Sequence, residues 1–175
     1  MTDYPSYSFD TASGPLTLAC IDIDEPNNGR MLYKVTLKLG ELDVTEKYFG
    51  GWNYINFNLD QYQPVSPDQT WIYIPQEGDH FLINANTLEK ILLAYVPLSA
   101  ATFKSNHFIE NTLLIINSNK IIAKNLDTGK EYLLEQPDNS TYFKAASILD
   151  QRKIQLLISN GTQIIVSAHT LITVD

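Results

Sequence analysis

Three stretches of the sequence repeat one pattern of apolar runs and turns, and this repeat constrains the fold more than any other feature. The stretches are residues 64–90, 113–130 and 156–166. Aligning Phe81 with Ile121 and Ile164 gives steps of 40 and 43 residues, a spacing that suits repeated units of about four short strands. A repeat scaffold of this kind usually provides a binding surface rather than a reaction centre.

Short apolar or alternating runs within each repeat predict β-strands. The predicted strands are 71–74, 80–84 and 90–96 in the first unit, 101–108, 112–117, 120–125 and 131–134 in the second, and 141–149, 154–159, 163–168 and 171–174 in the third. Turn residues such as Asp127–Lys130 and Asn160-Gly161 separate them. The segment Thr87–Ala94 also allows a short helix.

The N-terminal part predicts a hairpin. Leu16–Asp24 and Met31–Leu39 alternate apolar and polar residues, and the turn between them contains Pro, Asn and Gly. Leu42–Phe49 is interpreted as a further strand that ends at Gly50-Gly51. Residues 61–69 contain two prolines and are interpreted as a linker into the repeats.

These patterns predict an all-β fold of stacked antiparallel sheets, with an N-terminal β-hairpin followed by blade-like repeats. A β-sandwich is the alternative, because hairpins of similar length would give the same pattern. Residues 1–62 form the N-terminal hairpin region and residues 63–175 the three blade-like units. At 175 residues both regions fit into one compact domain.

The segment Val65–Ile74 resembles the Ser-Pro-Asp-Gly turn and following strand of WD-repeat-type propeller blades, with Gln69 in place of the usual glycine. Phe81–Lys90 and Ile121–Lys130 resemble the next blade strand with its turn. The resemblance covers about residues 64–174 and implies propeller-like sheets, although the Trp-Asp dipeptide is missing. Three blades do not close a ring, since propellers typically have four to eight. The repeats are therefore capped by the N-terminal hairpin, completed by further chains, or part of a sandwich.

Charge narrows the choice of partners. The chain has 20 acidic and 12 basic residues, a net charge of −8, and no basic cluster, so binding to nucleic acid or to an anionic membrane is disfavoured. A basic protein partner is permitted.

No secretory signal or membrane-spanning apolar run is recognisable, which predicts a cytoplasmic protein. Cys20 has apolar neighbours and is interpreted as a buried residue.

No catalytic or metal-binding constellation is recognisable, so no enzyme activity, metal or cofactor is predicted. His80, His107 and His169 are scattered and are interpreted as structural or surface residues. Asp22 and Asp24 lie two apart on one predicted strand and support a third hypothesis, a hydrolase. Carboxylate catalysis needs a second carboxylate across a cleft, and the sequence identifies none.

Aromatic residues gather around Gly50-Gly51 and give the candidate binding site. The candidates are Tyr48, Trp52, Tyr54 and Trp71. Aromatic side chains are favoured anchors at protein interfaces, although in a β protein they also fill the core. The first hypothesis is therefore a non-enzymatic protein-binding module, with an immunity- or antitoxin-type inhibitor of a basic toxin as its specific version. The second is a carbohydrate or small-ligand module that stacks its ligand on Trp52, Tyr54 and Trp71.

Overall fold

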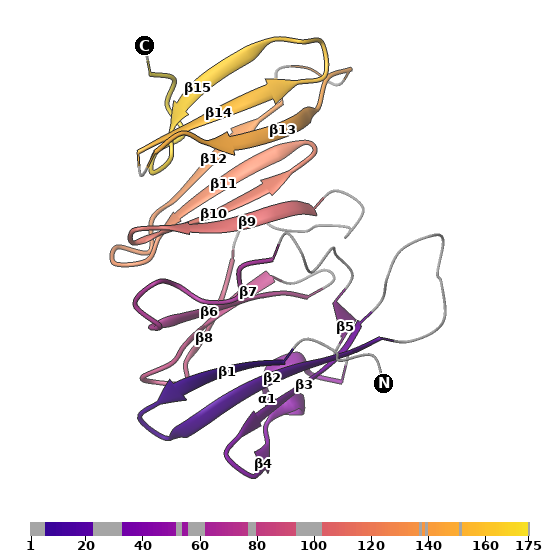
Figure 1. Ribbon diagram of the computed structural model, residues 1–175, viewed down its shortest axis with the longest axis vertical. Coiled ribbons are helices and arrows are strands. Elements are labelled where there is room, and N and C mark those ends of the chain that lie inside the picture. Colours follow the sequence, from indigo (N-terminus) through magenta and orange to yellow (C-terminus); the bar gives the residue numbers. More distant parts are fainter. Residues whose placement is uncertain are drawn as a thin grey trace. The chain divides into compact units, whose positions relative to one another are not determined.

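The computed structural model describes residues 6–22, 33–51, 54–55, 62–76, 80–93, 103–136, 138, 140–150 and 152–174. The chain divides into two compact units: Met1–Leu59 with Pro64–Ala101, and Asp60–Gln63 with Thr102–Asp175. The described part of both units consists of antiparallel sheets and one short helix (Figure 1). This confirms the predicted all-β fold of stacked antiparallel sheets.

The described residues of the first unit form two sheets. Its elements are β1 (Ser6–Thr11), β2 (Gly14–Asp22), β3 (Tyr33–Leu39), β4 (Leu42–Asp43), α1 (Thr45–Phe49), β5 (Tyr54–Ile55), β6 (Trp71–Pro75), β7 (His80–Asn84) and β8 (Lys90–Leu92). One sheet has the order β1-β2-β3-β4 with β5 on β3, and the other has the order β6-β7-β8. The predicted hairpin is present as β2 and β3, which pair from Leu16↔Leu39 to Asp22↔Tyr33.

The described residues of the second unit form two further sheets, one of four strands and one of three. Its strands are β9 (Phe103–Ile109), β10 (Thr112–Asn117), β11 (Lys120–Asn125), β12 (Glu131–Glu135), β13 (Phe143–Ile148), β14 (Lys153–Ile158) and β15 (Gln163–Ser167). The sheets follow the chain as two meanders, β12-β11-β10-β9 and β13-β14-β15. An isolated bridge between Val166 and Thr173 adds a fourth segment to the second of them.

The two sheets of the second unit pack face to face. Leu114, Ile116 and Ile121 from the first contact Ile154, Leu156 and Val166 from the second, and all of them are at most 2% exposed. Alternate residues of β14 are buried, namely Ile154, Leu156 and Ile158, which is the period-two pattern that the sequence shows. The apolar alternation therefore places one face of each strand in this core.

Three predicted elements are wrong in detail. Thr45–Phe49 is a helix rather than the end of a strand: the adjacent residues Tyr48 and Phe49 are both buried, which suits a helical turn, and Gly50 ends it in a left-handed conformation. Thr87–Ala94 contains no helix in its described residues, because Leu88 has a positive φ of 58° and β8 pairs with β7.

The third correction concerns the predicted linker, residues 61–69. Its described part is bonded into the sheets on both sides. Tyr73 N–H donates to the Pro64 carbonyl at 2.8 Å, and Val65 bridges Ile72. The Asn106 side chain accepts from Gln63 N–H at 3.0 Å and donates to the Gln63 carbonyl at 2.7 Å. Prolines are compatible with this role at the edge of a sheet.

Candidate functional site: the groove along strand β1

Strand β1 is the outer strand of the first sheet and has no partner beyond β2 among the described residues. The register shows which of its backbone groups face outward. Asp10 lies opposite Pro15, which has no N–H, and the Pro15 carbonyl accepts from Gly40 N–H on the other side at 2.8 Å. Asp10 and Pro15 therefore form a pair without mutual hydrogen bonds.

Hydrogen-bonded and non-bonded pairs alternate along an antiparallel ladder. The backbone groups of Tyr7, Phe9 and Thr11 therefore face β2. Those of Ser6, Ser8 and Asp10 face away from the sheet, and no backbone hydrogen bond joins them to another described residue there. Such an edge can pair with a strand from another chain.

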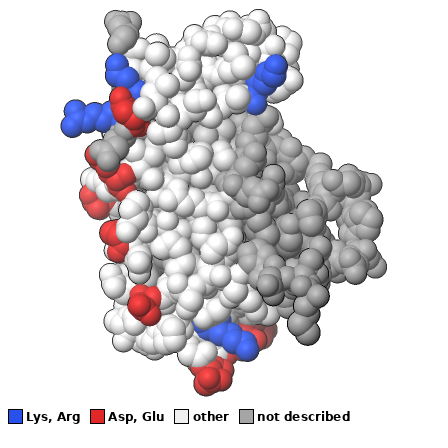
Figure 2. Space-filling model, in the orientation of Figure 1, with Lys and Arg blue, Asp and Glu red and all other residues white. Residues whose placement is uncertain are grey.

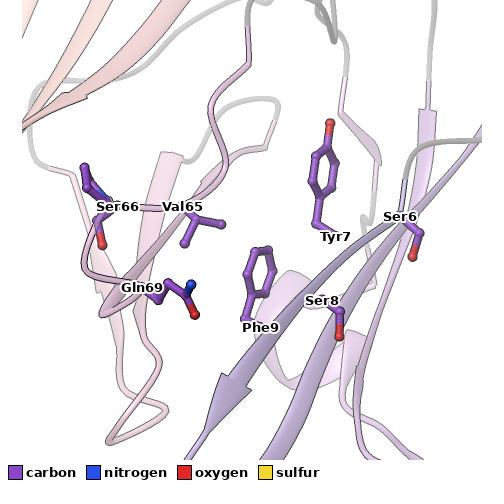
Figure 3. Close-up of a pocket in the computed structure, with 8 residues that line it drawn as sticks. Ser6, Tyr7, Ser8, Phe9, Val65, Ser66 and Gln69 are labelled. Atoms are coloured by element: carbon purple, nitrogen blue, oxygen red, sulfur yellow. The ribbon is translucent and has the colours of Figure 1, made fainter.

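A groove of about 450 Å³ runs along this edge and lies between β1 and the turn that precedes β6 (Figure 3). Its lining residues are Ser6, Tyr7, Ser8, Phe9, Val65, Ser66, Pro67 and Gln69. Successive residues of a strand face opposite sides, so a concavity that contacts four in a row follows the backbone edge. Its volume lies within the range of ligand sites. We call this concavity the β1 groove.

The opposite wall of the β1 groove is a rigid turn. Gln69 N–H donates to the Ser66 carbonyl at 2.9 Å. The Ser66 hydroxyl donates to Asp68 at 2.5 Å and accepts from Trp71 N–H at 2.9 Å, and Asp68 also accepts from Thr70 N–H at 3.1 Å. These bonds explain why the Ser-Pro-Asp sequence is found at this turn.

The charge beside the β1 groove is negative. The hydrogen bond from Ser66 lowers the pKa of the Asp68 carboxyl below its ordinary value, with a further contribution from Thr70, so Asp68 is ionised at neutral pH. Asp10 follows Phe9 on β1 and is exposed. The lining residues that the structure describes include no Lys, Arg, Asp or Glu. The groove is therefore neutral inside, and the sequence places an acidic residue next to each of its walls.

Of the predicted site residues, Tyr48 and Trp71 are not among the described lining residues of the β1 groove. Tyr48 is 2% exposed, and its hydroxyl donates to the Leu88 carbonyl at 2.8 Å, so its ring is part of the core. Trp52 and the side chain of Tyr54 lie outside the described residues, and the Tyr54 backbone pairs with Lys34. Trp71 begins β6 and is partly exposed. The use of Trp52, Tyr54 and Trp71 in binding stays a prediction.

A second concavity lies near the predicted site. It measures about 530 Å³ and is lined by Lys34, Thr36, Asp43, Thr45, Glu46 and Gly51. Thr45 N–H donates to Asp43 at 2.9 Å. Hydrogen bonds with the Thr45 side chain and, second, with its backbone hold the pKa of the Asp43 carboxyl below its ordinary value. The concavity is polar and contains charges of both signs.

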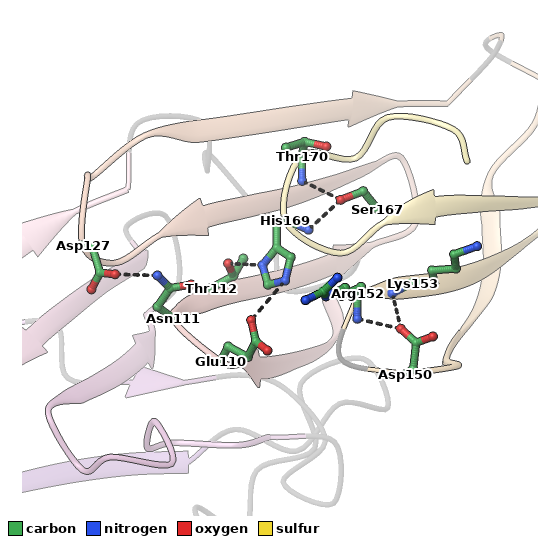
Figure 4. A network of polar contacts seen from close by, with 10 residues as sticks. All are labelled: Glu110, Asn111, Thr112, Asp127, Asp150, Arg152, Lys153, Ser167, His169 and Thr170. Atoms are coloured by element: carbon green, nitrogen blue, oxygen red, sulfur yellow. Dashed lines mark hydrogen bonds and ion pairs between the residues drawn. The ribbon is translucent and has the colours of Figure 1, made fainter. Parts of the chain in front are cut away.

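Polar side chains also meet at one end of the second unit (Figure 4). The Thr112 hydroxyl lies 2.7 Å from Nδ1 of His169, and Nε2 of His169 lies 3.5 Å from the Glu110 carboxylate. This hydroxyl–imidazole–carboxylate order is that of a hydrolytic triad. Thr112 is 0% exposed, however, so its hydroxyl cannot reach a substrate. The three residues connect the β9–β10 turn to the turn after β15.

The other two histidines are placed separately. His80 is 3% exposed, and its Nδ1 lies 2.5 Å from the hydroxyl of Tyr73, whose pKa is raised by burial. His107 lies in β9 opposite Leu114. Within the described ranges, no three His, Cys, Asp or Glu side chains are grouped as metal ligands, and no described helix is long and apolar enough to cross a membrane.

The surface charge is spread thinly. Most of the described surface visible in Figure 2 belongs to residues other than Lys, Arg, Asp and Glu, and the charged side chains lie mostly toward the edges of the view.

The hydrolase hypothesis rests on Asp22 and Asp24. The backbone of Asp22 is the last residue of β2. The Asp22 side chain and the whole of Asp24 lie outside the described residues, so the hypothesis stays a prediction.

The sequence does contain a signal for the β1 groove. Tyr7-Ser8-Phe9 alternates large and small residues, and the Ser-Pro-Asp turn is the part of the chain that most resembles a propeller blade. Sequence periodicity predicts no strand over Ser6–Thr11, and the turn falls in the predicted linker, residues 61–69. It does not show that β1 is an edge strand or that the turn lies beside it, because both depend on the order of strands in the sheet.

Comparison with known proteins gives a likeness in fold alone. No protein-family model matches the chain, and no curated protein matches it. BamB from Moraxella catarrhalis is similar at 14% identity with a TM-score of 0.47, over 99% of this chain and 51% of that one. The extracellular domain of the putative one component system BT4673 from B. thetaiotaomicron is similar at 9% identity with a TM-score of 0.49, over 97% of this chain and 25% of that one. The chain thus spans about half or less of these neighbours.

Proposed function

We propose that this chain is a non-enzymatic protein-binding module that recognises an extended segment of a partner by adding it as a strand to β1. The observation that carries the proposal is the register of β1, which turns the backbone groups of Ser6, Ser8 and Asp10 outward beside the β1 groove. In strand addition, main-chain hydrogen bonds supply affinity, and pockets for alternate side chains supply specificity. Strand β1 offers the outward backbone groups, and the β1 groove beside it offers the pocket.

The reach of the edge fits a short segment. Three outward residues at alternate positions span five residues of a partner strand, or about 17 Å at 3.4 Å per residue. Each hydrogen bond contributes about 0.5–1.5 kcal/mol net. Natural proteins protect free edges with Lys, Pro or a β-bulge. Strand β1, with the sequence SYSFDT, has no Lys or Pro, and its pairing with β2 has no register shift.

The partner segment is basic in this proposal. Asp10 and Asp68 lie next to the lining residues in sequence, and the whole chain has a net charge of −8. Lys or Arg residues at the ends of the segment would face these carboxylates, and the long-range field would speed association at low salt. The specific version, inhibition of a basic toxin in the cytoplasm, requires that the bound segment belong to such a protein.

The experiment is the substitution Ser8→Pro. Ser8 N–H faces outward and makes no bond within the sheet, so proline removes one donor to the partner and leaves the β1–β2 ladder intact; proline is tolerated at such edge positions. Loss of this bond leaves a partner carbonyl unpaired, which costs about 1–3 kcal/mol, so the dissociation constant should rise about 5- to 150-fold. Ser8→Ala keeps the N–H and is the matched control. Equal affinities for the two variants, both folded, would refute strand addition at β1.

The carbohydrate or small-ligand module stays a second candidate because of the polar concavity at Lys34, Asp43 and Glu46. Tyr54 pairs with Lys34 in register, so the backbone of this one predicted residue lies beside a lining residue of the concavity. Titration with a panel of mono- and oligosaccharides, followed by tryptophan fluorescence, tests it. A fluorescence change that Glu46→Gln abolishes would support it, and no change with any sugar would remove it.

A further inference from the structure

Gln69 has a backbone conformation that is unfavourable for its own side chain. Its φ is 59°, in the left-handed region where residues other than glycine are uncommon and cost about 1–2 kcal/mol. The Ser66 carbonyl holds Gln69 N–H in this position, and glycine is the usual residue at such a position. A strained residue of this kind is a starting point for a functional hypothesis when its side chain lies in a candidate site.

The Gln69 side chain lies in such a site. Gln69 is an exposed lining residue of the β1 groove, and Figure 3 shows its carboxamide on the side of the turn that faces Phe9 of β1. No hydrogen bond of the carboxamide is found with a described residue. One acceptor and two N–H donors are therefore available at the wall opposite the free strand edge.

We infer that Gln69 is the specificity-determining residue of the β1 groove and recognises a side-chain amide, Asn or Gln, in the partner strand. This inference rests on the proposed strand addition at β1. A second carboxamide matches both the acceptor and the donors of Gln69. The described lining has no Lys or Arg to attract a carboxylate, and Asp10 and Asp68, which adjoin the lining in sequence, favour cationic side chains in the flanks of the segment. The recognised segment is thus extended, has an amide side chain at the groove and has basic flanks.

Substitutions of Gln69 separate recognition from folding. Gln69→Gly relieves the positive φ, offset in part by the greater flexibility of glycine in the unfolded chain, so the melting temperature should stay the same or rise by up to about 4 °C. Gln69→Ala keeps the backbone restriction and removes the carboxamide. Both variants should bind the partner segment about tenfold more weakly, the effect of losing one or two hydrogen bonds. Leu88→Gly, at a positive φ of 58° outside the groove, is the matched control and should not change the affinity.

The probe is a library of random twelve-residue peptides displayed on phage, selected against the full chain. Enriched peptides should share an Asn or Gln and flanking Lys or Arg. Dissociation constants are then measured for the wild type and each variant, and for a peptide with Ala in place of its amide residue. The amide-to-Ala change should weaken binding to the wild type about tenfold and have little further effect on Gln69→Ala, because both changes remove the same contact.

The outcomes distinguish this inference from the proposed function. If Ser8→Pro weakens binding but Gln69→Ala does not, strand addition stands and the role of Gln69 is refuted. If Ser8→Pro has no effect or no peptide is enriched, both are refuted. A fall in melting temperature of more than about 4 °C in Gln69→Gly, more than 1 kcal/mol at this size, would make Gln69 a structural residue and overturn the inference.

Discussion

Asn117 gives a prediction that reverses the usual effect of a core substitution. The residue ends β10 and is 0% exposed. Neither its side-chain nitrogen nor its oxygen has a hydrogen-bond partner among the described residues. Burial of an amide without a partner costs about 1–3 kcal/mol in mutational data. Replacement by leucine, which has the same branching at Cγ, removes this cost and adds apolar burial. We expect Asn117→Leu to raise the free energy of unfolding by about 1–3 kcal/mol.

The assay is thermal unfolding followed by calorimetry, in which each kcal/mol corresponds to about 2–4 °C in a chain of this size. Asn117→Ala removes the amide without adding volume, so it should fall between wild type and leucine. Asn125→Leu is the matched control of opposite sign. Its side-chain oxygen accepts from the N–H groups of Asp127 and Thr128 and from the Thr128 hydroxyl, and loss of these bonds should destabilise the chain.

The reasoning on Asn117 fails if both Asn117→Leu and Asn117→Ala lower the free energy of unfolding by more than about 1 kcal/mol. That result would mean that the amide makes a favourable bond in solution, since leucine leaves no cavity at this position and an unpartnered amide has no hydrogen bond to lose. A buried water molecule with two or more polar contacts is the physical arrangement that would produce it.

Three further predictions concern buried polar groups. Lys124 and Glu131 form an ion pair at 2.7 Å, and their side chains are 9% and 8% exposed. Lys124→Met should therefore lower the free energy of unfolding in urea by about 3–5 kcal/mol, because it leaves the Glu131 charge buried without its partner, and the double variant Lys124→Met, Glu131→Leu should recover most of this loss. An equal loss in the single and the double variant would contradict this reasoning. Burial raises the pKa of the Cys20 thiol to about 12, so a thiol reagent at pH 8 should label it after unfolding but not in the native chain. Burial lowers the pKa of His107 in the folded chain, so below the ordinary histidine pKa of about 6.5 the unfolded chain binds a proton that the folded chain does not. The stability from His107 should therefore be complete above about pH 6.5 and fall as the pH drops below it. Unfolding measured at pH 5 and pH 8 should show this loss in the wild type and not in His107→Gln.

The sequence predicts the repeated part of the fold well because its strands are set by local patterns. The predicted strand 112–117 is the observed β10 without change, and 120–125 is β11. In both, a short apolar run is bounded by turn residues that fix its ends. Cys20 also lies where its neighbours indicate, at 1% exposure.

The errors arise where local patterns and tertiary contacts compete. Leu42–Phe49 satisfies the period of a strand, but Gln76 donates a side-chain hydrogen bond to the Phe49 carbonyl at 3.1 Å, and the Phe49 ring packs edge-on against Phe81 at 5.5 Å. These contacts with a sheet about 30 residues further along the chain favour a helical turn. No local pattern contains this information.

The side-chain pattern does not predict the β1 groove, for a related reason. The large aromatic residues near Gly50-Gly51 are the more prominent signal, and Tyr48 shows that such a ring is equally suited to a core. The β1 groove depends instead on the backbone groups of Ser6, Ser8 and Asp10, which face away from β2 and have no partner among the described residues. This is a property of strand order and register, and the side-chain sequence of one strand does not specify it.

Amide hydrogen exchange of β1, measured by NMR with and without an enriched peptide, tests the central claim most directly. In the free chain the N–H groups of Tyr7 and Phe9, which face β2, should exchange slowly, and those of Ser8 and Asp10 should exchange fast. Binding by strand addition should slow Ser8 and Asp10 at least tenfold, because each N–H gains a hydrogen bond. Unchanged exchange at Ser8 and Asp10 in the saturated complex would contradict the account, wherever else protection appears.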